Sequence, residues 1–214
     1  MHDYIIGEAI KKSIDQNKSI LVLGSPRSGT HALGSVIHKQ LANYEYFGEI
    51  CAINDTLSPW NEIEKLYTSK LSIAHLVAMT SKLRVSSDVD RIHEHCVVIQ
   101  LRRKNKIAQF ASYMYFHLTG GVNGPAWHNH KITDTKIGPG SVIASDEQID
   151  QFLLEQMIDD FFKPNYVVDY EQLNFDQSTI KKNKFSYDIS MMFKNLDYVV
   201  ERLGKWKYGH GEPS

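Results

Sequence analysis

The chain has 214 residues, 42% hydrophobic and 23% charged, which is the composition of an ordinary globular protein with one sizeable core. Its 24 Lys and Arg residues nearly balance 25 Asp and Glu residues, so no overall positive field would attract nucleic acid or an anionic membrane. The two cysteines, Cys51 and Cys96, have no metal-type spacing and argue against a disulfide-stapled secreted scaffold.

Apolar runs bounded by turn residues alternate with stretches of helical period, a pattern typical of parallel strands connected by helices. Residues 19–23 form a short apolar run that predicts a strand buried on both faces, and it ends at Gly24. Apolar side chains then recur every three or four positions, which predicts a helix over residues 29–44. A second strand is predicted over residues 44–47, closed by Gly48.

The middle of the chain continues this alternation. Ser58 and Pro59 suit the cap and first turn of a helix that reaches about Tyr67, whereas residues 71–83 are ambiguous. A second buried strand is predicted over residues 96–101, followed by a helix over residues 105–118.

Residues 120–145 hold many glycines and prolines and predict a long irregular segment, which in compact domains is often functional. The remaining expected elements are a helix capped by Ser145 (residues 146–162), a strand (166–170), a closing helix (189–203) and a flexible tail (204–214). The whole pattern predicts one domain over residues 1–214, an α/β fold with a P-loop-type central parallel sheet flanked by helices. Because the apolar runs are far shorter than the roughly 20 residues of a membrane helix and the N-terminus has no signal-peptide pattern, we expect a cytoplasmic protein without membrane insertion.

The most informative residues join the first strand to its helix, from Gly24 to His31. Backbone N–H groups at a helix start lack intrahelical partners and carry the positive end of the helix dipole, so a phosphate binds there readily. Arg27 adds a full charge, and the hydroxyls of Ser28 and Thr30 add donors. Gly29 permits close approach of the backbone to a ligand.

This turn differs from a Walker A loop in two positions. Gly24 and Gly29 have the Walker spacing, but Thr30 stands at the lysine position and His31 at the position of the magnesium-binding hydroxyl. The differences weaken an ATPase interpretation and favour a phosphate ligand that needs no metal.

The segment Pro26-Arg27-Ser28-Gly29-Thr30 resembles the first loop of sulfotransferases that use 3′-phosphoadenosine 5′-phosphosulfate (PAPS), most closely the bacterial carbohydrate-type and phage-type members. The second signature of that family is a strand ending in Arg, followed by a helix with a Ser, and Arg103 and Ser112 fit it. The spacing is nine residues where the family usually has eight, so Lys104 is an alternative to Arg103, and Arg102 a weaker one.

A third signature, Tyr170-Glu171-Gln172-Leu173 after a strand, supports the fold, and the resemblance covers residues 19–173. It implies a nucleotide site that binds PAPS and its product 3′-phosphoadenosine 5′-phosphate (PAP) without a metal. The residues implied for that site are Arg27, Ser28, Gly29, Thr30, His31, Arg103, Ser112 and Trp127.

Glu49 is the candidate general base, since related carbohydrate-type enzymes resemble this chain in having a Gly-Glu pair after the second strand. We expect that strand to lie beside the first, which would bring Glu49 near the sulfonate, with Arg27 stabilising charge there. His31 and His75 are alternative bases.

The resemblance implies transfer of a sulfonate to a hydroxyl of a carbohydrate, glycolipid or small metabolite, with residues 120–145 on the acceptor side. A P-loop nucleotide kinase and a non-catalytic nucleotide-binding module are the alternatives. Five metal-ligating residues have weak spacing for a metal site, and no metal is expected: His93, His95, Cys96, His128 and His130.

Overall fold

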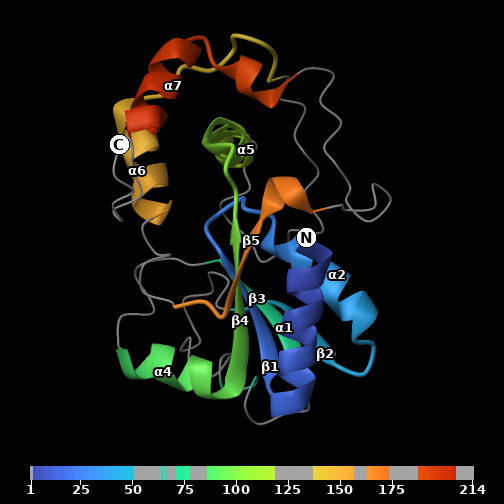
Figure 1. Cartoon of the computed structure of the whole chain (residues 1–214). Helices are drawn as coiled ribbons and strands as arrows, with labels where there is room; N and C mark the ends of the chain where they lie inside the picture. The colour runs from blue at the N-terminus through green and yellow to red at the C-terminus, as the bar shows by residue number, and fades with distance from the viewer. Residues whose placement is uncertain are drawn as a thin grey trace. The chain divides into compact units, whose positions relative to one another are not determined.

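The computed structural model describes residues 2–50, 64, 66, 71–77, 86–118, 137–156, 163–173 and 188–205. The chain divides into two compact units (Figure 1). Unit 1 comprises residues 1–104 and 158–182, and unit 2 comprises residues 105–157 and 183–214.

Unit 1 is built on a five-stranded sheet in the order β2-β3-β1-β4-β5, in which every neighbouring pair is parallel. The strands are β1 (Ser19–Gly24), β2 (Glu45–Ile50), β3 (Ser72–Val77), β4 (Cys96–Arg102) and β5 (Tyr166–Asp169). The chain therefore has the expected α/β fold, with a parallel central sheet flanked by helices. All five strands point the same way, so their carboxyl ends meet at one edge of the sheet, where such folds bind ligands.

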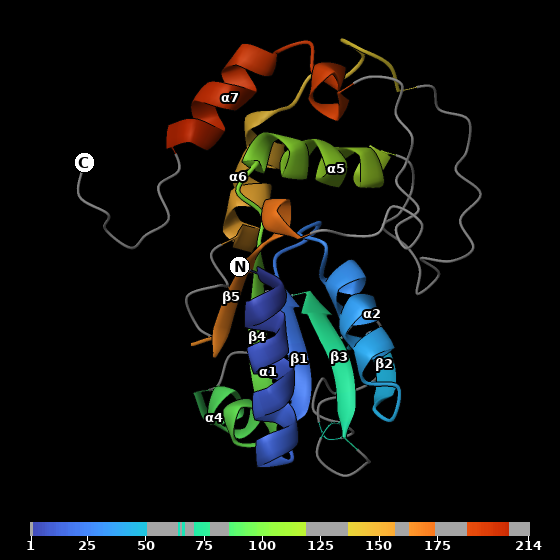
Figure 2. The same ribbon diagram turned by 45° about the vertical axis from the view of Figure 1, so that its right-hand side comes forward.

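Helices cover both faces of this sheet. The helices α1 (His2–Gln16) and α2 (Thr30–Gln40) lie on one face (Figure 2), where Ile6 and Leu33 share a core with Ile20. The helix α4 (Ser86–His95) covers the other face, where Ile92 packs in the core that contains Leu21. Alternate residues of β1 thus enter different cores, which explains why its sequence is apolar at almost every position.

The structure corrects the expected strand order. The second strand was expected beside the first, but β3 lies between them and pairs with both β1 and β2. The strand β2 also continues to Ile50, past a register shift between Tyr46 and Gly48. Glu49 therefore belongs to the strand itself rather than to the loop after it.

The sequence interpretation also missed or misplaced several helix boundaries. It did not predict α1 or α4, and the helix expected over residues 29–44 ends at Gln40. The ambiguous segment 71–83 contains β3.

Unit 2 is helical and has its own core. Its helices are α5 (Lys106–Leu118), α6 (Asp146–Gln156), the 3₁₀ helix η3 (Ile189–Met192) and α7 (Leu196–Lys205). The ring of Phe110 packs 5.1 Å from Phe152 and 5.2 Å from Phe193, measured between ring centroids. The closing helix expected over residues 189–203 is divided, because Phe193 leaves the helical path to form a bridge with Val142.

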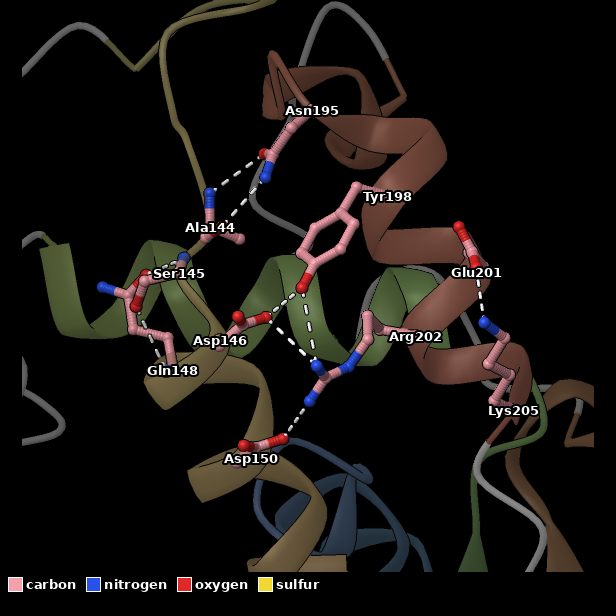
Figure 3. A network of polar contacts seen from close by, with 10 residues as sticks. All are labelled: Ala144, Ser145, Asp146, Gln148, Asp150, Asn195, Tyr198, Glu201, Arg202 and Lys205. Carbon is pink, nitrogen blue, oxygen red and sulfur yellow. Dashed lines mark hydrogen bonds and ion pairs between the residues drawn. The ribbon is translucent and has the colours of Figure 1, made fainter.

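Polar contacts tie α6 and α7 together (Figure 3). Ser145 caps α6 as expected: its hydroxyl accepts from the Gln148 N–H at 3.3 Å, and Gln148 Oε1 accepts from the Ser145 N–H at 3.0 Å. From α7, Tyr198 donates to Asp146, and Arg202 pairs with Asp146 and Asp150. These groups are largely exposed, so each ion pair contributes little to stability.

Asn195 makes the less exposed contact of this network. Its Oδ1 accepts from the Ala144 N–H at 3.0 Å, and its Nδ2 donates to the Ala144 carbonyl at 2.9 Å. We expect Asn195→Ala to lower the free energy of unfolding by about 1–3 kcal/mol, because two backbone groups lose their partners. The control Lys205→Ala, which removes an exposed pair with Glu201, should leave the free energy of unfolding nearly unchanged. Chemical denaturation of the two variants measures both effects. Equal losses of unfolding free energy would contradict the larger contribution assigned to the contact of Asn195 with Ala144.

Several expectations lie outside the described residues. They concern most of the helix over residues 58–67, residues 119–136 of the irregular segment, residues 157–162 of the helix after Ser145, and the tail from residue 206. Within the part of the chain that the structure describes, no helix combines the length and apolar character that a membrane crossing needs. Cys96 is buried without a disulfide, and burial raises the pKa of its thiol to about 12.

Candidate functional site

The turn between β1 and α2 has a backbone shaped for an anion. Arg27 has a φ of 63° and Gly29 a φ of 101°, so two residues of the turn are left-handed. The Ser28 N–H donates to the Ser25 carbonyl at 3.1 Å, which closes the turn between them. Turns in which left-handed and right-handed residues alternate point successive N–H groups into one concavity, and such concavities bind phosphate.

Ser28 lies at the centre of this turn with its side chain fully buried. Its Oγ has no hydrogen-bond partner among the described residues. The hydroxyl packs directly over Gly24, so that a Cβ built there would collide with Ser28 Oγ and lie 2.7 Å from Thr30 Cγ2. A buried hydroxyl without a partner is costly, and an oxygen-rich ligand at the turn would supply the missing bond.

The start of α2 provides further donors. Gly29 stands at the N-cap and offers no side-chain cap for the first helical turn. Thr30 opens the helix with a buried side chain, and the next residue, His31, is exposed. The N–H groups of a first turn have no intrahelical acceptor, so the dipole and these donors together favour an anion.

Arg103 reaches the turn from the end of β4. Its Nη1 donates to the carbonyl oxygen of Arg27 at 3.1 Å, and its Cζ lies 4.9 Å from the centroid of the Tyr170 ring. Its buried Nε has no partner among the described residues. Two strands that are distant in sequence, β1 and β4, pair side by side and so bring Arg27 and Arg103 together.

The charge of Arg103 affects the ionisation of Arg27. Burial lowers the pKa of Arg27 from its usual value, the Arg103 charge lowers it further, and Glu49 and Tyr170 oppose both effects. Burial likewise lowers the pKa of Arg103, while Tyr170 and Glu171 raise it. Both groups stay cationic at neutral pH, because arginine starts from a very high pKa. A bound anion between them would relieve their repulsion.

The neighbouring cations are committed elsewhere. Lys104 pairs with Asp169 at 2.8 Å, and its backbone N–H donates to Glu171 at 3.0 Å. Arg102 is exposed and donates to Gln100 at 3.2 Å. Of the three consecutive cations, Arg103 is therefore the one whose side chain bonds to the turn.

The three candidate bases lie at the same edge of the sheet. Glu49 and His75 are paired residues of β2 and β3, and Glu49 Oε2 lies 3.8 Å from His75 Nε2. The rings of His31 and His75 are 5.3 Å apart. His75 is buried, whereas the Glu49 side chain is 21% exposed, so Glu49 is the more accessible of this pair to a substrate.

Two residues that the sequence interpretation did not assign to a site also lie here. Tyr46 OH is 3.4 Å from His75 Nδ1, and Tyr170 contacts both the turn and Arg103. Tyr170 directly follows β5, and that position at the carboxyl end of a strand was a signal that could have found it. Tyr46 is the second residue of β2 and carried no such signal. The motif containing Tyr170 was taken to support the fold more than the chemistry.

The remaining expected site residues do not belong to the described part of unit 1. Ser112 belongs to α5 in unit 2, and Trp127 lies outside the described residues, as do His128 and His130. Across the described ranges, no group of three or more His, Cys, Asp or Glu side chains is arranged to hold a metal ion.

The chain matches no protein-family model, and it has no significant match among curated proteins or solved structures.

Proposed function

We propose that the protein is a PAPS-dependent sulfotransferase that transfers a sulfonate to a hydroxyl of a carbohydrate, glycolipid or small metabolite. The turn between β1 and α2 would hold the 5′-phosphate and sulfonate, and Arg103 the 3′-phosphate. The nucleotide is a substrate in this proposal, and the product is PAP.

The observation that carries the proposal is that two buried polar groups, each following a different strand, lie at the same turn without a partner among the described residues. Ser28 offers a buried hydroxyl without a partner among the described residues, and Arg103 offers a buried Nε in the same condition beside the same turn. One monophosphate would need only the turn, whereas a nucleoside bisphosphate would engage both groups. A ligand with two separate anionic groups therefore suits the arrangement best.

The residues at the lysine and magnesium-ligand positions of a Walker loop support the choice of a metal-free reaction. Thr30 is buried against Gly24 through its methyl group, and His31 follows it. Thr30 does not supply the charge of the Walker lysine, and His31 does not supply the hydroxyl ligand of the next position. A Mg²⁺-dependent kinase of this type relies on both groups.

The proposed roles follow from the geometry. Arg27 stabilises charge on the transferred group, since it brings a buried positive charge to the turn, and the charges of Arg103 and Glu49 both affect its pKa. Glu49 accepts the proton of the acceptor hydroxyl as the new oxygen–sulfur bond forms. The bond between sulfur and the bridging phosphate oxygen breaks, and its electron pair leaves with PAP.

Calorimetric titration with PAP, and separately with ATP and Mg²⁺, tests the proposal without knowledge of the acceptor. We expect metal-independent binding of PAP, weakened about 10- to 100-fold by Arg103→Ala because a charge-assisted contact to phosphate is lost. The matched control is Arg102→Ala, whose exposed side chain contacts Gln100, and it should leave the affinity within about twofold.

A preference for Mg-ATP over PAP would favour the kinase alternative and contradict this proposal. Binding of PAP without sulfonation of any acceptor in a broad panel would instead favour a non-catalytic nucleotide-binding module.

A further inference from the structure

The side chain of Tyr170 lies between the phosphate-binding turn and Arg103. Tyr170 begins the 3₁₀ helix η2 (Tyr170–Gln172), directly after β5. A Cβ built on Gly29 would lie 2.6 Å from Tyr170 Cε2 and 2.7 Å from Cδ2, so the ring packs tightly against the turn. The guanidinium of Arg103 lies 4.9 Å from the centroid of the same ring.

The ring and the turn together fix the orientation of Arg103. A free arginine side chain samples many rotamers, and ordering it upon ligand binding lowers affinity. Here the aromatic ring attracts the guanidinium, and the Nη1 bond to the Arg27 carbonyl fixes one end of it. The Nε remains without a partner among the described residues and is therefore available to an anion.

We propose that Tyr170 is a positioning residue, whose ring holds Arg103 in the orientation that binds the 3′-phosphate of a nucleoside 3′,5′-bisphosphate. The inference rests on the proposed function, since it assigns Arg103 to that phosphate. This role belongs to the ring and not to the hydroxyl, because the attraction to a cation comes from the ring. Phenylalanine at this position should therefore retain the function of tyrosine.

The test is a double-mutant cycle on PAP affinity, measured by calorimetry. We expect Tyr170→Leu to weaken PAP binding about tenfold and Tyr170→Phe to change it less than threefold. In the Arg103→Ala background, Tyr170→Leu should change the affinity less than twofold, because the residue through which the ring acts is gone.

The affinity for adenosine 5′-phosphate distinguishes loss of the positioning role from damage to the turn, because a damaged turn would weaken the binding of both ligands. Adenosine 5′-phosphate lacks the 3′-phosphate, so Tyr170→Leu should leave its affinity within about twofold while that for PAP falls. The matched control is Tyr166→Leu, at the start of the strand β5 that precedes Tyr170. The Tyr166 ring faces Lys12 at 5.7 Å, and its replacement should leave both affinities unchanged.

Thermal unfolding accompanies each variant, and Tyr170→Met replaces the leucine variant if that one unfolds. A Tyr170→Leu variant that binds PAP as well as the native protein overturns the positioning role and leaves the proposed function intact. The positioning role is also overturned if Tyr170→Leu lowers the affinities for PAP and adenosine 5′-phosphate equally. The same holds if Tyr170→Leu weakens PAP binding as much in the Arg103→Ala background as in the native protein. Failure of the native protein to bind PAP overturns the proposed function, and this inference with it.

Discussion

Replacing Glu49 by glutamine should lower the rate of sulfonate transfer about 10²- to 10⁴-fold while PAP affinity changes less than threefold. The amide has nearly the same shape as the carboxylate but cannot accept the proton of the acceptor hydroxyl. Glu49 lies on β2 with a partly exposed side chain beside His75, so the change removes a base without opening the core. Transfer from labelled PAPS to a panel of carbohydrates and small hydroxyl compounds measures the rate, and calorimetry measures the affinity.

The matched control is Glu45→Gln, at the opposite end of the same strand, where the side chain is exposed. It should leave the rate within about twofold. A Glu49→Gln enzyme with an unchanged rate would remove Glu49 from the mechanism. If His31→Asn then lowered the rate in its place, the base would be the histidine that follows the turn.

The strands that carry the candidate site were predictable from sequence because they are buried on both faces. Residues of β1 and β4 alternate between the two cores and are apolar in nearly every position, which sets them apart from helices. The strand β3 was ambiguous because His75 interrupts its apolar run, although the structure buries that imidazole. Whether a polar side chain is buried depends on its neighbours in the fold, and the periodicity of the sequence does not show which residues these neighbours are.

The two missed helices differ in how much signal they carried. In α1, buried Ile6 and Ala9 follow the helical spacing, so this helix could have been predicted from its apolar face. In α4, Val89 and Ile92 are the apolar residues, too few to define a stripe. Its position is fixed instead by packing against the sheet, which is a long-range contact.

Strand order and the choice among neighbouring cations could not be predicted from spacing. The insertion of β3 between β1 and β2 depends on chain crossovers that no local pattern records. Arg103 and Lys104 are adjacent in sequence, and they are separated by contacts made in the fold: Lys104 pairs with Asp169, whereas Arg103 donates to the Arg27 carbonyl. The turn itself could be predicted from the sequence, because Gly24, Ser28 and Gly29 lie within one short segment.

Replacing Gly29 by alanine should abolish measurable PAP binding and lower the free energy of unfolding by about 1–3 kcal/mol. Alanine is strained at a φ of 101°, and its Cβ would lie 2.6 Å from the Tyr170 ring, a contact that neither backbone nor ring can accommodate in place. Relief of the collision must move the turn or displace Tyr170 from Arg103, and either movement disrupts the two groups that we propose bind the phosphates. Calorimetry and chemical denaturation measure the two effects on one sample.

The matched control is Gly140→Ala in unit 2, since Gly140 also has a positive φ, 65°, but nothing within 4 Å of a Cβ built on it. It should lose about 1 kcal/mol through backbone strain alone and keep its PAP affinity. A Gly29→Ala variant that still binds PAP would contradict the role of this turn as the phosphate site, because its left-handed backbone and the close approach of Tyr170 would then be unrelated to the ligand. A loss of binding confined to Gly29→Ala, with both variants folded, would place the effect in the geometry of the turn rather than in general strain.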